Sequence, residues 1–161
     1  MKCVIDTAGF GKMVFTLYPE YAPITVENFV KVTRSGFYDG LCWCRIVKGY
    51  VIQGGSPDND IMTDSKWHIK GEFTANGVSN PLQHIRGALS MARDDAPDTA
   101  GTQFFVVHED APQLDGRYAA FGEMEKGFDV LDAIAALPTY GAETWNKPVS
   151  MPVITSITIE G

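Results

Sequence analysis

Short runs in which apolar and polar residues alternate occupy most of this chain. In Lys12–Tyr18, for example, Met13, Phe15 and Leu17 share one face, which is the pattern of a strand with one buried side. Other strands are predicted at Met1–Asp6, at Leu41–Ile52 as two strands bent around Lys48-Gly49, and at His68–Phe73, Gly87–Arg93, Thr102–His108, Tyr118–Glu123 and Val153–Ile159. In this last strand, we expect every second residue from Val153 onward to face the same side.

Two segments repeat their apolar residues at helical spacing instead. The first places Val26, Phe29, Val30 and Thr33 on one face. We expect Thr25 to cap this helix, Glu27 to lie in its first turn and Gly36 to end it. The second helix is predicted at Phe128–Leu137, directly before Pro138.

The order of these elements predicts the fold class. The chain is mainly β, and its first and last strands flank all other elements, which favours a closed sheet without exposed edges. The two amphipathic helices would cover the open ends of that sheet. We expect residues 1–161 to form a single domain, since no linker or repeat is visible. Regular βαβ units are absent, which disfavours a doubly wound α/β fold.

Composition and charge narrow the classes of partner. The chain has 161 residues, 45% of them hydrophobic, and a formal net charge of −7. This charge argues against nucleic acid or an anionic membrane as the main partner. No apolar run is long enough for a membrane span or, at the N-terminus, for a signal peptide. Three cysteines do not make a disulfide framework, and we therefore expect a cytoplasmic protein.

The stretch RIVKGYVIQGG, residues 45–55, carries the most informative chemistry. Arg45 lies in an otherwise apolar strand, where an arginine is costly unless it has a partner or a task. In GTQFFVV, residues 101–107, Gln103 and Phe105 share a strand face and leave Phe104 for the core. Together these stretches predict a shallow apolar pocket edged by one cation and two amides, suited to a small apolar ring beside a carbonyl group.

Each of these residues also has an ordinary structural interpretation when it is taken alone. Arg45 could be a paired structural arginine, Tyr50 and Phe105 could pack in the core, and Gln53 could be a turn amide. Cys42 and Cys44 resemble half of a metal site, but no further ligand cluster completes it, and we interpret both as buried thiols. The three histidines, His68, His84 and His108, are scattered singly and are interpreted as structural or surface residues.

Nearly the whole chain resembles the cyclophilin-type peptidyl-prolyl cis-trans isomerases. The matching pieces, in order, are PEYAPITVENFVKV, GFYDG, RIVKGYVIQGG, GALSMAR, GTQFFVV, LDGRYAAFG and the final strand. The resemblance implies a closed eight-stranded antiparallel β-barrel capped by two α-helices. It also implies a proline pocket on the outer surface of the barrel, and neither a cofactor nor a metal.

The resemblance assigns roles to individual residues. Arg45 matches the catalytic arginine of the family, and Gln53 the glutamine that positions it. The proline pocket would be formed by Tyr50, Val51, Phe105, Leu114 and Tyr118. The substrate groove would be formed by Ala92, Arg93, Gln103 and Gln113.

Several of these positions depart from the family pattern. Tyr118 stands where many relatives have histidine, and Val51 where they have methionine. Gln113 replaces a tryptophan that contributes to cyclosporin binding in relatives, so any affinity for cyclosporin should be weakened. Arg93 replaces an asparagine, and the adjoining loop contains Asp94, Asp95 and Asp98. This acidic loop suggests a preference for substrates with basic flanking residues.

The sequence therefore predicts an isomerase that rotates X–Pro bonds in peptides and in unfolded or folding proteins. Arg45 would stabilise the twisted amide while the pocket holds the proline ring. The alternative is a proline-motif binding module or scaffold with little turnover. A closed barrel of this size has no obvious need for a partner subunit, and we expect a monomer.

Overall fold

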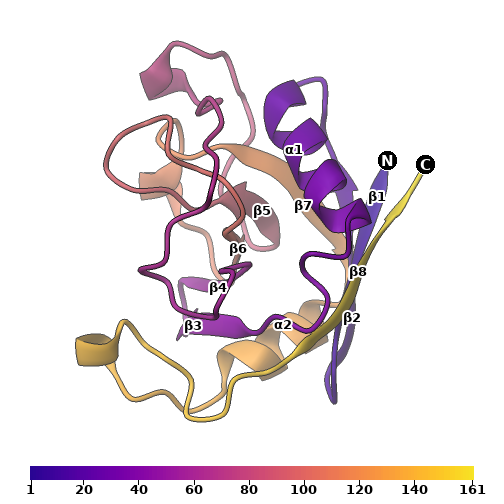
Figure 1. Cartoon of the computed structure of the whole chain (residues 1–161), viewed down its shortest axis with the longest axis vertical. Coiled ribbons are helices and arrows are strands. Elements are labelled where there is room, and N and C mark those ends of the chain that lie inside the picture. Colours follow the sequence, from indigo (N-terminus) through magenta and orange to yellow (C-terminus); the bar gives the residue numbers. More distant parts are fainter.

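The computed structural model describes all residues 1–161 and contains eight β-strands and two α-helices (Figure 1). The strands are β1 (Lys2–Thr7), β2 (Gly11–Leu17), β3 (Trp43–Val47), β4 (Val51–Gly54), β5 (Ala88–Met91), β6 (Phe104–Val107), β7 (Ala120–Lys126) and β8 (Ile154–Glu160). The helices are α1 (Pro23–Arg34) and α2 (Phe128–Ala135). Three short 3-10 helices, η1 (Thr74–Asn76), η2 (Pro112–Leu114) and η3 (Ala142–Thr144), lie in the connections.

All eight strands belong to one curled antiparallel sheet, in the order β3-β4-β6-β5-β7-β2-β1-β8. The predicted β-rich barrel is confirmed, although β3 and β8 do not pair along their lengths. They meet just outside the strands, where Cys42 and Val153 form an isolated bridge. The amide of Trp43 donates to the carbonyl of Pro152 at 3.0 Å, and that of Ile154 donates to Leu41 at 2.8 Å. A few hydrogen bonds thus complete the barrel where the two sheet edges meet.

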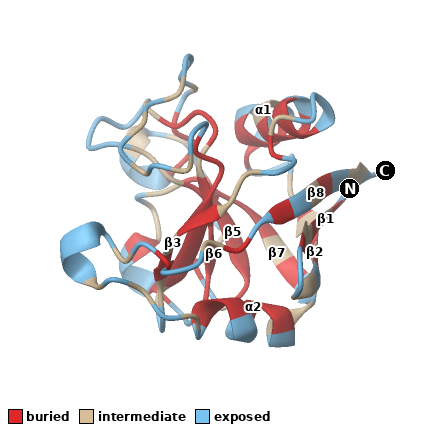
Figure 2. Cartoon of the chain, turned by 60° about the horizontal axis from the view of Figure 1, so that its bottom comes forward, coloured by how far each residue is buried: buried red, intermediate tan, exposed pale blue.

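The two helices cover opposite ends of the barrel and turn their buried faces toward it (Figure 2). Helix α1 begins earlier than predicted, at Pro23, so the expectation that Thr25 is its N-cap was wrong. Proline is favoured at a first helical position because it has no amide hydrogen to leave unpaired. Glu27 consequently falls in the second turn. The predicted apolar face is confirmed, since Val26, Phe29, Val30 and Thr33 are all buried.

A carboxylate from a distant loop performs the capping role that Thr25 was expected to play. The backbone amide and the hydroxyl of Thr25 both donate to Oε1 of Glu72, at 2.6 and 2.7 Å. Glu72 lies in the segment His68–Phe73, which was predicted to be a strand. This prediction was wrong, because only Ile69 forms a β-bridge there, to Ala100. This segment is held mainly by side-chain contacts, and its buried Glu72 faces the positive end of α1.

Strand β8 contains an irregularity that changes which residues face the core. Its pairing with β1 shifts between Asp6 and Thr7, which pair with Ser156 and Ile154. Thr155 is therefore an extra residue, as in a β-bulge. Ile154 and Ile157 are buried, whereas Val153 and Thr155 are exposed. The predicted alternation from Val153 onward was therefore wrong in its first half.

Strands β4 and β6 separate two apolar clusters. Ile52, Phe104 and Val106 point into a cluster of 27 buried residues that fills the barrel. Their neighbours Val51 and Phe105 point the other way, into a cluster of six buried residues on the outer surface. The alternation predicted for Phe104 and Phe105 is confirmed. The inner face of this strand pair packs in the barrel core, and its outer face carries the side chains of the second cluster.

Candidate active site

Arg45 reaches the outer surface because strand β3 contains one extra residue. Trp43 pairs with Gly54 and Arg45 pairs with Gln53, so Cys44 is an additional residue opposite this stretch of β4. In a regular strand, Trp43 and Arg45 would point to the same side. The bulge at Cys44 instead lets Trp43 fill the core while Arg45 points outward. Ile46, the next residue, returns to the core.

The outward residues of four neighbouring strands form a continuous row. Arg45 is paired with Gln53, Gln53 with Phe105, and Phe105 with Ser90. Directly opposed residues on adjacent strands lie within side-chain contact distance. The register of the sheet therefore places the cation, the amide and the aromatic ring side by side, although Phe105 is far from the other two in the sequence.

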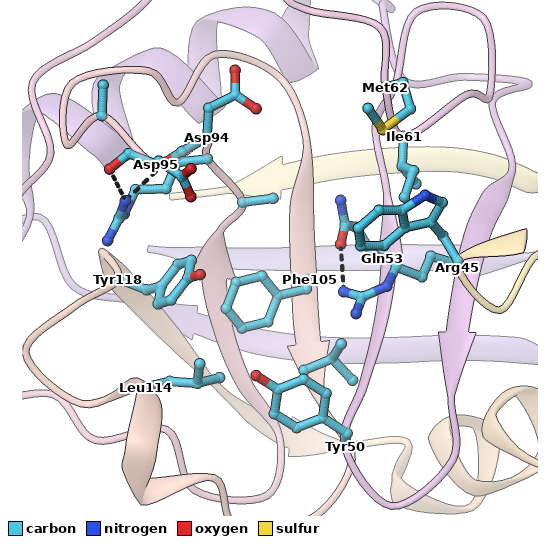
Figure 3. A pocket seen from close by; sticks show the side chains of 15 residues that line it. Arg45, Tyr50, Gln53, Ile61, Met62, Asp94, Asp95, Phe105, Leu114 and Tyr118 are labelled. Carbon is cyan, nitrogen blue, oxygen red and sulfur yellow. Dashed lines mark hydrogen bonds between the residues drawn. The ribbon is translucent and has the colours of Figure 1, made fainter. Parts of the chain in front are cut away.

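A chain of amides fixes the orientation of the Arg45 guanidinium. Its Nη1 donates to Oε1 of Gln53 at 3.3 Å (Figure 3), and Nε2 of Gln53 donates to Oε1 of Gln103 at 2.9 Å. Nε2 of Gln103 donates in turn to the carbonyls of Ile61 and Thr63, at 3.2 and 3.1 Å. Each amide is thus held at both ends, and the chain is anchored to the loop that follows β4.

The Arg45 side chain has no carboxylate partner. Five ion pairs occur in the structure and none includes Arg45, while its buried Nε has no hydrogen-bond acceptor. A partly buried cation without a counterion costs free energy, so the paired structural arginine considered from the sequence is not what is observed. The guanidinium keeps donors available for a molecule bound beside it.

A cavity of about 650 Å³ lies over the outer cluster. Its apolar wall contains Tyr50, Val51, Phe105, Leu114 and Tyr118, with Arg45 and Gln53 at one side (Figure 3). The Phe105 and Tyr118 rings meet edge to face at 5.8 Å between centroids. Burial is the main reason why the pKa of Tyr50 is raised. Tyr118 raises this pKa further, and Arg45 acts in the opposite direction. The phenol of Tyr50 is therefore neutral at physiological pH and serves as an apolar wall with a polar tip.

Arg93 braces the opposite side of the cavity. Its guanidinium donates to the carbonyls of Asp94, Asp95 and Arg117 and stacks over the rings of Tyr118 and Phe73, at 4.7 and 4.9 Å. The charge of Arg93 therefore holds the loop together. The carboxylates of Asp94 and Asp95 form no ion pair and line the cavity.

Nine of the eleven residues predicted for the site line this one cavity. Gln103 lines a small adjoining cavity of about 50 Å³ and reaches the site through Gln53. Gln113 is exposed on η2 and lines neither cavity. The roles proposed below for individual residues are based on these positions.

Sequence reasoning missed five residues at this site. Four of them line the cavity from loops: Ile61, Met62, Ala96 and Trp145, which directly follows η3. His84 lies behind the aromatic wall, stacked on Phe105 at 5.9 Å between ring centroids. No periodic pattern marks these positions, because loops and long-range stacking leave no regular spacing in the sequence. Exposed Trp and Met residues in loops were the only available signal.

His84 was interpreted as a structural or surface histidine, and it is fully buried. Its Nδ1 lies 3.0 Å from Oδ1 of Asp115, and its Nε2 lies 2.9 Å from Oγ of Ser90. The carboxylate can only accept, so Nδ1 carries the hydrogen and Nε2 accepts from Ser90. Burial lowers the pKa of His84, against an opposing contribution from Asp115. The neutral ring therefore supports Phe105 and Tyr118 from behind.

No cysteine or histidine lines the cavity, and His84 lies behind its aromatic wall. Cys44 is buried in the β3 bulge, which raises the pKa of its thiol to about 12, and Cys3 is buried in the core. No group of three or more His, Cys, Asp or Glu side chains lies close enough to hold a metal ion. Neither helix has the length and apolar composition that a membrane span requires.

Comparisons with known proteins agree with this fold. The family model described as cyclophilin type peptidyl-prolyl cis-trans isomerase/CLD matches residues 2–159. Peptidyl-prolyl cis-trans isomerase B of Bacillus subtilis is 45% identical over 119 residues, which are 74% of this chain and 80% of that protein. Peptidyl-prolyl cis-trans isomerase A of Dickeya dadantii is 33% identical over 156 residues, which are 94% of this chain and 80% of that protein.

A solved structure matches over the entire chain. The cyclophilin-type isomerase of Cryptosporidium parvum, crystallised in the presence of the dipeptide Ala-Pro, has a TM-score of 0.89 and 29% identity. The match covers 100% of this chain and 99% of that one. Sequence and fold lead to the same conclusion: the chain belongs to the cyclophilin-type peptidyl-prolyl cis-trans isomerases.

Proposed function

We propose that the protein catalyses rotation about X–Pro bonds by holding the proline ring against Phe105 while Arg45 stabilises the twisted amide. The observation that carries this proposal is the Arg45 guanidinium, fixed by Gln53 at the edge of an apolar cavity and without a carboxylate partner. The substrates would be proline-containing peptides and unfolded or folding proteins. The Ala-Pro dipeptide present with the Cryptosporidium parvum relative supports this substrate class.

Isomerisation of an X–Pro bond requires only that the protein bind the substrate and stabilise charge in the twisted state. Rotation about the peptide bond has a barrier of about 20 kcal/mol because the amide loses its resonance, and unaided X–Pro isomerisation takes roughly tens to hundreds of seconds. In the twisted state, the proline nitrogen becomes pyramidal and regains a lone pair. A donor aimed at that region stabilises the twisted state more than either planar isomer, which is the condition for catalysis.

The residues around Arg45 supply this differential binding. The apolar wall of Tyr50, Phe105 and Tyr118 holds the ring and excludes water, which strengthens each electrostatic contact inside the cavity. Gln53 and Gln103 keep the guanidinium in place before the substrate arrives, so little reorganisation is needed during rotation. Ala92 and Arg93, on the opposite side, would pair with the substrate backbone. No nucleophile or proton transfer takes part.

A test compares wild type with Arg45→Ala, using exchange NMR on a short X–Pro peptide. Removing one transition-state donor in an enclosed site commonly costs on the order of 100-fold or more in rate, and we expect a loss of that size. Arg34→Ala is the matched control, because Arg34 is exposed in the last turn of α1 and makes no side-chain hydrogen bond. Binding without acceleration by folded wild type would instead support a proline-motif binding module.

Three further expectations belong to this proposal. Gln113 stands outside the cavity, which supports a weak affinity for cyclosporin, and a titration with cyclosporin tests it. The three free cysteines support a cytoplasmic location. The barrel carries both its core and its pocket within one chain, which supports a monomer, and sedimentation measures that state.

A further inference from the structure

The cavity extends beyond what a proline ring needs, on the side of Arg45. Its volume of about 650 Å³ falls within the range of about 300–1,000 Å³ seen for sites that hold drug-sized ligands. Ile61 and Met62 lie on this side, next to Arg45 and Gln53 (Figure 3). Trp145 also lines the cavity. The three apolar side chains come from two separate loops, and the loop of Trp145 is hydrogen-bonded to Ile46, next to Arg45.

Met62 and Trp145 are unusually exposed for residues of their type. Met62 is 70% exposed, the highest value among the large apolar side chains of the chain, and Trp145 is 56% exposed. Single exposed apolar residues are common and need no explanation. Here two of the most exposed ones line the same cavity as the apolar proline pocket. The exposed area is therefore continuous with the proposed active site.

The backbone at Trp145 is held in a conformation that tryptophan disfavours. Only three non-glycine residues have a positive φ: Asn59, Trp145 and Asn146. Asparagine tolerates this left-handed region, whereas a bulky side chain there costs free energy. Residues in such conformations gather at ligand sites more often than elsewhere. A residue chosen for stability alone at position 145 would be glycine or asparagine.

The loop that carries Trp145 is fixed to the site. The amide of Ile46, the residue after Arg45, donates to the carbonyl of Asn146 at 3.0 Å. Within the loop, Trp145 donates to Ala142 at 3.0 Å and Asn146 donates to Gly141 at 3.0 Å. The indole is therefore presented on an ordered backbone beside the catalytic strand. With the backbone already fixed, only the side-chain torsions of Trp145 remain to be ordered when a ligand binds.

We propose that Trp145, with Ile61 and Met62, forms a subsite for a large apolar side chain next to the X–Pro pair of a substrate. This proposal rests on the proposed function and names the class of substrate that the site favours. The positive charge of Arg45 at this end of the cavity disfavours a lysine or arginine as the occupant. Met62 and Trp145 supply exposed apolar surface, and its burial favours an apolar occupant.

The test compares peptides that differ only in the residue flanking the X–Pro pair, which is Ala, Phe or Glu on either side. For wild type, we expect kcat/KM for a Phe-flanked peptide to exceed that of the Ala-flanked peptide roughly three- to tenfold, the value of one aromatic contact. In Trp145→Asn, this ratio should fall to about one, since asparagine keeps the left-handed backbone but removes the indole. Trp145→Phe should restore part of it.

Tyr140→Asn provides the matched control. Tyr140 lies in the same loop and is 58% exposed, but it does not line the cavity, so this variant should keep the wild-type ratio. The ratio is measured within each variant, so a general loss of activity cancels. An unchanged ratio in Trp145→Asn would overturn the proposal, as would wild-type ratios near one on both flanks or a preference for Glu that depends on Trp145.

The same experiment separates this subsite from the proposed function. Acceleration of the Ala-flanked peptide by wild type but not by Arg45→Ala supports the proposed function whatever the Phe-to-Ala ratio. If wild type accelerates neither peptide, the proposed function fails. The ratio of Kd values for the two peptides, from NMR titration of wild type and Trp145→Asn, then decides the subsite by itself.

Discussion

His84 links the aromatic wall of the site to the polar interior behind it. The ring stacks on Phe105 and meets Tyr118 edge to face, while Ser90 and Asp115 hold its two nitrogens. In the protonated ring both nitrogens donate, so the Ser90 hydroxyl would have to turn and accept, and the buried ring would carry a charge that burial disfavours. Protonation therefore disturbs the support of the pocket wall.

This arrangement predicts a pH dependence of stability. The pKa of His84 is lowered in the folded protein, mainly by burial and against the influence of Asp115. The unfolded chain therefore binds the proton more readily, and stability falls as the pH drops from about 6.5 toward the lower folded value. We expect urea unfolding free energies of wild type to decline over this window more steeply than those of His84→Gln. Parallel curves for the two proteins would contradict this role of His84.

The start of helix α1 is held by a residue from a distant part of the sequence. Glu72 lies 47 positions after Thr25, the helix residue to which it is hydrogen-bonded. Glu72, which is 2% exposed, accepts from the amide and the hydroxyl of Thr25 at the start of the helix. A buried carboxylate at this place satisfies otherwise unpaired donors and faces the positive end of the helix dipole. The loop that contains Glu72 is thus tied to the helix that covers one end of the barrel.

We expect Glu72→Gln to destabilise the protein by about 1–3 kcal/mol, the usual cost of weakening a buried charged hydrogen bond. Glu27→Gln is the matched control, because Glu27 is exposed on the same helix and its side chain makes no hydrogen bond, and its effect should stay within about 0.5 kcal/mol. Chemical unfolding of both variants measures the difference. Equal stability of the two would show that Glu72 does not act as the cap.

The sequence predicted elements well where a single period governs them, and failed where an extra residue or a distant partner intervenes. Met13, Phe15 and Leu17 alternate without interruption, and their strand was predicted with its buried face. The bulges at Cys44 and Thr155 shift the alternation by one residue, and no composition signal marks them. The capping by Glu72 joins two segments whose proximity only the folded chain provides.

The residues of the candidate site also fall into those that the sequence predicted and those that it did not. Matching motifs led to the prediction that Arg45, Gln53, Phe105 and most of the pocket wall lie together, and the structure places them around one cavity. His84 acts through stacking on a distant strand, and Trp145 through a loop with no periodic pattern, so neither could be inferred from spacing. Residues on the regular strands of a site are therefore easier to predict than the residues that support or extend it.

At the scale of the whole molecule, charge is distributed unevenly around the cavity. The net charge is −7, and Asp94 and Asp95 line the side of the cavity opposite Arg45. Neither carboxylate forms an ion pair, since the Arg93 guanidinium is engaged by backbone carbonyls. A peptide with a basic residue near this edge would meet a favourable potential, in agreement with the preference suggested by the acidic loop.

We expect a Lys-flanked X–Pro peptide to be isomerised with a higher kcat/KM than its Glu-flanked counterpart. The difference should shrink between about 0.01 M and about 1 M salt, as the Debye length falls from about 30 Å to about 3 Å. Asp95→Asn should reduce the difference at low salt, whereas Asp129→Asn, which changes an exposed acidic residue outside the cavity, should reduce it less. Equal rates for both peptides at low salt would remove the idea.

The separation of the two apolar clusters by β4 and β6 has a consequence for how this protein can be changed. The 27-residue cluster inside the barrel and the six-residue cluster outside it share a wall but no side chain. We therefore expect substitutions on the inner face to change mainly stability, and those that line the cavity on the outer face to change mainly substrate binding. In protein engineering, the residues of the two faces can therefore be varied in separate mutant libraries, provided that the extra residue at Cys44 is kept.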